Sequence, residues 1–151
     1  MTQKPIDHIA LDDFWPYQAV VLADQISRYT LSIVRTESDL NLSQWRVLAA
    51  VAEEPGRTAA QVTAITPMDK TIVSRAVSSL ITLGLITKTS DTSDKRRSSL
   101  STTSAGQDIY AKVAEHLNTA LMDKGNGDYA PEDFTLMLKS FSEKLSILTN
   151  S

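Results

Sequence analysis

The chain has 151 residues, of which 42% are hydrophobic, and it carries a net charge of −3 and no cysteine. This length and composition predict one soluble globular domain over residues 1–151, with a modest core. The lack of cysteine excludes disulfides and cysteine-ligated zinc or iron–sulfur sites, and no apolar run approaches the ~20 residues of a membrane span. Residues 1–13 lack the apolar core of a signal peptide, so we expect a cytoplasmic protein without membrane contact.

A long helix is predicted over about residues 13–35, after an N-terminal arm of residues 1–12. Its apolar residues recur at three- and four-residue steps, and Pro16 fits only in its first turn. A second helix is predicted to begin at Asn41, whose side chain would cap it, with Gln44 completing a capping box. Pro55 and Gly56 would end this helix.

Two short helices joined by a tight turn are predicted between Thr58 and Gly84. Thr58 and Gln61 form a capping box for the first, and Pro67 is expected at the first position of the second. One face of the second helix is apolar and the other is polar and basic. That polar face carries Lys70, Thr71, Ser74, Arg75 and Ser78. Gly84 ends the helix, and the whole segment has a helix-turn-helix pattern.

A β-hairpin with a cationic tip is predicted directly after Gly84. Residues 85–89 have strand composition, a polar stretch over residues 90–97 follows, and Leu100 lies in a second strand-like segment. The tip contains Lys95, Arg96 and Arg97. A hairpin in this place is a wing, which can reach a phosphate or the minor groove while the preceding helix enters the major groove.

The distribution of charge agrees with a DNA-binding surface in this part of the chain. Residues 57–97 hold seven cations and three acids, a net charge of +4, whereas the rest of the chain has a net charge of −7. Nucleic-acid affinity depends on the local field at the binding surface, and the acidic remainder would favour one docking face. The alternative is that the cations form an ordinary solvated face.

Two further helices are predicted after the hairpin, at about residues 104–124, capped by Thr103, and from Pro131 onward. The last helix carries apolar residues at heptad-like steps, namely Phe134, Leu138, Phe141, Leu145 and Leu148. The helix-turn-helix and wing occupy only the middle of the chain. We therefore expect the terminal helices to pack together and against their copies in a second subunit.

Several of these segments together resemble the MarR family of bacterial transcription regulators. The resemblance rests on residues 42–48, 68–77, 83–86 and 94–98, with Leu100, Thr103 and Gly106 at matching places. It implies a mainly α fold with a small β-hairpin wing. Residues 41–103 would form a winged helix-turn-helix DNA-binding region, and residues 13–40 and 104–151 the dimerisation helices of a two-fold homodimer.

The resemblance also implies which residues contact double-stranded DNA. The expected DNA-binding residues are Lys70, Thr71, Ser74 and Arg75 on the recognition helix and Lys95, Arg96 and Arg97 in the wing. Arg75 could contact guanine through two hydrogen bonds, and Asp94 would order the wing by pairing with an arginine. The alternative is that these are solvent-facing polar residues.

An aromatic or phenolic effector is a further implication of the resemblance. Family members often bind such anions between the dimer helices and the winged domain. The residues that could form such a pocket are Trp15, Tyr17, Tyr29, Trp45 and Arg46. The alternative is that the aromatic residues belong to the core and that Arg46 lies on the surface.

The sequence offers no catalytic or cofactor-binding pattern. His8 and His116 are far apart, and no metal-ligand spacing or phosphate-binding loop is present. We therefore do not expect an enzyme, a metal or another cofactor. The leading hypothesis is a sequence-specific, ligand-responsive repressor that binds a pseudo-palindromic operator as a homodimer. The alternative is a winged-helix protein-interaction module that has lost DNA binding, for which the cations Lys70, Arg75, Arg96 and Arg97 would be unnecessary.

Overall fold

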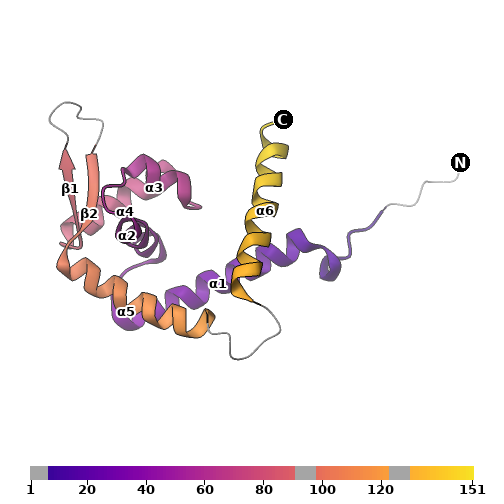
Figure 1. The fold of residues 1–151 in the computed structure, drawn as a ribbon, viewed down its shortest axis with the longest axis horizontal. Coiled ribbons are helices and arrows are strands. Elements are labelled where there is room, and N and C mark those ends of the chain that lie inside the picture. The colour runs from indigo at the N-terminus through magenta and orange to yellow at the C-terminus, as the bar shows by residue number, and fades with distance from the viewer. Residues whose placement is uncertain (1–6, 91–97, 123–129) are drawn as a thin grey trace, which may run out of the picture. The chain divides into compact units, whose positions relative to one another are not determined.

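Helices make up most of the structure, a computed structural model that describes residues 7–90, 98–122 and 130–151. The chain forms two units, residues 1–110 and 111–151. In order, the elements are η1 (Leu11–Asp13), α1 (Trp15–Glu37), α2 (Leu42–Glu53), α3 (Ala59–Ile65), α4 (Lys70–Thr82), β1 (Ile86–Ser90), β2 (Ser98–Thr102), α5 (Ser104–Leu121) and α6 (Pro131–Thr149) (Figure 1). The predicted mainly α fold with a small β-hairpin is confirmed. That residues 1–151 form one domain stays a prediction.

The two predicted capping boxes begin α2 and α3. At α2, the Asn41 side chain accepts a hydrogen bond of 2.8 Å from the backbone N–H of Gln44, and Gln44 Oε1 accepts one of 2.8 Å from the N–H of Asn41. At α3, Thr58 and Gln61 make the same reciprocal pair. Each pair satisfies two N–H groups that a helix start would otherwise leave without a partner.

The first long helix, expected from about Asp13, begins at Trp15 with Pro16 in its first turn, because residues 11–13 form a separate 3-10 turn and Phe14 is the N-cap. The predicted start of α4 at Pro67 was wrong, because the helix begins at Lys70 and Pro67 lies in the turn before it. Asp69 is the N-cap, since its carboxylate accepts a 2.8 Å hydrogen bond from the N–H of Ile72.

The two strands form an antiparallel hairpin that is also held to the segment before α3. Ile86 pairs with Thr102, and Ser90 pairs with Ser98. The N–H of Gly56 donates to the carbonyl of Leu100 (2.8 Å), and the N–H of Leu100 donates to the carbonyl of Arg57 (2.9 Å). The base of the hairpin is therefore fixed on the helix-turn-helix by backbone hydrogen bonds.

Helix α2 lies at the centre of the first unit and packs against α1, α3, α4 and β2. Figure 1 shows α2, α3 and α4 gathered beside the β1–β2 hairpin. The largest fully buried side chains of this unit are aliphatic: Val34, Val47, Leu48, Val51, Val62, Val73, Leu80, Ile86 and Leu100. The apolar face of α4 thus packs into a core that also holds the strands, which leaves its opposite face for solvent.

The start of α5 lies directly against the residues that end α4. As predicted, Thr103 caps α5, because its hydroxyl oxygen accepts a hydrogen bond of 3.1 Å from the N–H of Gly106. The same hydroxyl donates a bond of 2.6 Å to the carbonyl of Gly84. A Cβ atom at Gly106 would lie 2.0 Å from the carbonyl oxygen of Leu85. Only glycine therefore permits this close approach.

The described helices include none with the length and apolar character that crossing a bilayer would require.

Candidate nucleic-acid interface

The polar face of α4 is exposed along its length. Lys70, Thr71, Ser74 and Arg75 are all exposed, whereas Val73, Ala76, Val77 and Leu80 on the other face are buried. Because residues three and four apart share a helix face, the four predicted contact residues lie together on the N-terminal half of the helix. This face presents two cations and two hydroxyl groups, which suits contacts to phosphates and base edges.

Arg75 also borders a cleft between α4 and the start of α2. The cleft has a volume of about 290 Å³, and it is lined by Asn41, Ser43, Gln44, Ile72, Arg75, Ala76 and Ser79. Gln44 and Ser79 are joined across it by a hydrogen bond of 2.6 Å. The exposed face of α4 is therefore continuous with the polar N-terminal turn of α2.

The predicted wing residues Asp94, Lys95, Arg96 and Arg97 lie outside the described residues. The strands on either side, β1 and β2, are described, and Lys88 on β1 is exposed. The roles assigned to the tip from the sequence stay predictions.

Arg57, counted with the cations of this region, is already paired. Its guanidinium lies 2.6 Å from a carboxylate oxygen of Glu53 and 3.0 Å from one of Glu54, and it donates a bond of 2.7 Å to the carbonyl of Ala50. Its side chain is only 14% exposed. Two acids offset its charge, so it adds little to the field at the α4 face. Its side chain instead binds the C-terminal end of α2 and Glu54, the residue after that helix.

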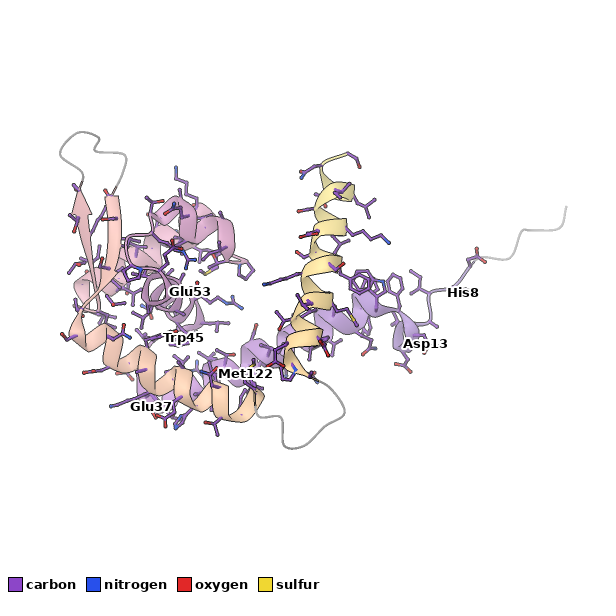
Figure 2. The ribbon with its side chains drawn as sticks, viewed as in Figure 1. His8, Asp13, Glu37, Trp45, Glu53 and Met122 are labelled. Carbon is purple, nitrogen blue, oxygen red and sulfur yellow. The ribbon has the colours of Figure 1, made fainter. Side chains whose placement is uncertain are left out.

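Of the five predicted effector residues, two line a common pocket and three do not. Trp45 and Arg46, neighbours on α2, line a pocket of about 410 Å³ together with Ala49, Ala50, Glu53, Ile65, Thr66, Pro67 and Tyr110. Figure 2 labels Trp45 and Glu53, which lie in the first and last turns of α2. Trp15, Tyr17 and Tyr29 lie on α1, are partly exposed and do not line this pocket.

Tyr110 is a pocket residue that the sequence prediction missed. Its ring stacks on Trp45, with centroids 5.9 Å apart and an angle of 19° between the planes. Arg46, the cation in the pocket lining, donates a hydrogen bond of 3.2 Å to the hydroxyl of Ser27 on α1. The sequence showed Tyr110 only as one apolar position of a helix, and 65 positions separate it from Trp45.

No metal centre is visible in the part of the chain that the structure describes. There, no three histidine, aspartate or glutamate side chains lie close enough together to hold an ion.

Comparison with known proteins supports the resemblance. Residues 38–97 match the sequence model of the MarR family. A MarR/EmrR family transcriptional regulator from Acinetobacter sp. ADP1 has a TM-score of 0.77 at 20% identity, over 91% of this chain and 99% of that chain. A MarR protein from Peptoclostridium difficile has a TM-score of 0.76 at 21% identity, over 95% and 94%. A MarR family transcriptional regulator from Silicibacter pomeroyi has a TM-score of 0.74 at 20% identity, over 93% of both chains. No curated protein matches in sequence.

Proposed function

Because residues 38–97 match the sequence model of the MarR family and the described chain has the winged-helix fold of these structures, we propose that the protein is a sequence-specific DNA-binding transcription regulator. One observation carries the proposal. The exposed face of α4, with Lys70, Thr71, Ser74 and Arg75, lies inside the matched segment and opposite a fully apolar buried face. The second helix of a helix-turn-helix, with its exposed basic face, is the element that reads the major groove.

In this proposal each residue type has a separate task. Arg75 donates two hydrogen bonds to O6 and N7 of a guanine, which distinguishes that base from the other three. Lys70 neutralises a phosphate, and Thr71 and Ser74 contact a base edge or a phosphate. Lys95, Arg96 and Arg97 contact the backbone or the minor groove, where a narrow groove concentrates negative potential.

We further propose that the protein acts as a two-fold homodimer. Helix α6 buries no residue in the single chain. Its exposed apolar side chains include Phe134, Leu136, Met137, Leu138, Leu145, Ile147 and Leu148. On α1, Val20 and Ile26 are also exposed. Apolar area of this extent is expected to be covered by a partner. Two-fold symmetry would place two recognition helices about 34 Å apart, one helical turn of DNA, on a pseudo-palindromic operator.

The pocket beside Trp45 supports an effector-responsive repressor. Its wall combines two stacked rings with the Arg46 guanidinium, a chemistry that suits an aromatic or phenolic anion. The pocket is also lined by Ile65, Thr66 and Pro67, which lead from α3 into the turn before α4. An anion that contacts both α2 and this turn would favour one orientation of the recognition helix, and so could release the operator.

The test is selection of genomic DNA fragments bound by the full-length protein, followed by titration of the most enriched fragment. We expect a short pseudo-palindromic sequence to be enriched and to bind at least about 1,000-fold more tightly than random duplex. A variant with Lys70 and Arg75 both replaced by glutamate is the matched control, and should enrich nothing. Uniform recovery of all fragments by the wild-type chain would instead favour the protein-interaction module.

A further inference from the structure

Gln44 uses both ends of its side-chain amide, and each end contacts a different helix. Its Oε1 accepts a 2.8 Å hydrogen bond from the backbone N–H of Asn41, which completes the capping box of α2. Its Nε2 donates a 2.6 Å bond to Ser79 Oγ, in the third turn of α4. The amide orientation follows from the first bond, because a backbone N–H can only donate and so must face the oxygen.

The second capping box of the chain provides an internal comparison. Gln61 occupies the same position of α3, and its Oε1 accepts a 2.9 Å bond from the N–H of Thr58. Gln61 is exposed, whereas Gln44 is half-buried and Ser79 is half-buried opposite it. The local motif is thus the same in both helices, and the bond across to the recognition helix distinguishes Gln44.

We propose that Gln44 is a positioning residue for DNA recognition, which sets the rotation of α4 about its axis relative to α2. The inference rests on the proposed function as a DNA-binding regulator. Gln44 would contact no base itself. It would act through Ser79 on the orientation of the recognition face.

The physical reason is the difference between apolar packing and a hydrogen bond. The buried face of α4 consists of Val73, Ala76, Val77 and Leu80, and apolar burial constrains direction only weakly. A hydrogen bond is directional and short-ranged, so it favours one rotation of the helix. Ser79 lies one helical turn after Arg75, on the same face. A restraint at Ser79 therefore acts directly on the placement of Arg75.

The first experiment compares Ser79→Ala with the matched control Thr82→Ala. Thr82 is exposed in the last turn of the same helix, beyond the predicted contact residues of its N-terminal half, and does not line the cleft. The probes are a duplex of the most enriched genomic fragment and a random-sequence duplex of equal length. We expect Ser79→Ala to bind the enriched duplex about two- to tenfold more weakly, because the variant loses the net free energy of one ordinary hydrogen bond. Its affinity for the random duplex should be unchanged. Ser79→Thr, which keeps the hydroxyl, should restore the preference.

The second experiment separates positioning from helix stability. Gln44→Ala and Gln61→Ala each remove one capping-box side chain, so both should lower the urea midpoint, and Gln44→Ala should lower it further because it also loses the bond to Ser79. Only Gln44→Ala should reduce the preference for the enriched duplex, and combining it with Ser79→Ala should cause no further loss.

The outcomes distinguish this inference from the function on which it rests. A wild-type chain that binds the enriched and random duplexes equally would overturn both. A wild-type chain that discriminates, with Ser79→Ala discriminating equally well, would overturn the positioning role alone.

Discussion

The indole ring of Trp45 on α2 stacks on the phenol ring of Tyr110 on α5, with centroids 5.9 Å apart and planes inclined by 19°. Trp45 is buried. The stack joins the helix before the helix-turn-helix to the helix after the wing, and it forms one wall of the proposed effector pocket. Removing either ring should therefore affect stability and effector binding together.

Replacing Tyr110 by leucine should lower the free energy of unfolding by about 0.5–1.5 kcal/mol beyond the loss of buried area, because the ring–ring attraction is removed. Trp45→Ala should cost about 3–5 kcal/mol, since it empties a buried site. Urea denaturation measures both. Tyr110→Phe keeps the stack and should unfold as the wild type does. Equal losses for Tyr110→Phe and Tyr110→Leu would show that the hydroxyl, and not the ring, matters.

Gly106→Ala should destabilise the chain by about 1–3 kcal/mol, the usual cost of inserting an atom into a packed site. The new Cβ would lie 2.0 Å from the carbonyl oxygen of Leu85, so the start of α5 must move away from the residues before β1. Thermal or urea unfolding measures the loss. Ser104→Ala, an exposed change in the same turn, is the control and should be nearly neutral. A Gly106→Ala chain of wild-type stability would contradict the close approach.

Arg75→Ala should weaken binding to the enriched duplex by about 1–3 kcal/mol and relax the base preference at one position of each half-site. The reason is that alanine cannot donate hydrogen bonds to a base edge. Titration against a panel of single-base variants of the duplex measures both effects. Lys70→Ala should instead weaken binding to all duplexes alike. If Arg75→Ala weakens binding to the enriched duplex and to random DNA by the same factor, as expected for Lys70→Ala, Arg75 contacts only phosphate.

Arg96→Ala should reduce affinity and make it less sensitive to salt. For each phosphate that the variant dimer no longer neutralises, the slope of log affinity against log salt should shrink by about 0.9. Titrations across a salt series measure the slope, with Lys88→Ala on β1 as a comparison within the same hairpin. An unchanged slope for Arg96→Ala would remove this residue from the DNA-binding set.

Leu145→Glu should dissociate the proposed dimer, because burying a carboxylate at an apolar interface is costly. Leu145 lies on the heptad-like seam of α6, whereas Ser140, also exposed, lies off it. Ser140→Glu adds the same charge and should leave the oligomeric state unchanged. Sedimentation at micromolar concentration measures the mass. A wild-type chain that sediments as a monomer would contradict the two-fold arrangement directly.

The sequence by itself determined the elements whose signals are local. The capping boxes at Asn41 and Thr58, the stop at Gly84 and the cap at Thr103 each depend on residues within four positions of one another, and the structure contains all four. The polar and apolar faces of α4 follow from helical periodicity for the same reason. The start of α4 was wrong because Pro67 and Asp69 both mark helix starts, and only Asp69 supplies a side-chain acceptor.

The tertiary structure decided every relationship between distant residues. Gln44 reaches Ser79 across 35 positions, and Tyr110 reaches Trp45 from another helix. Composition and periodicity describe which face of an element is buried. They do not describe which element covers it, because that depends on how the packed helices meet in space.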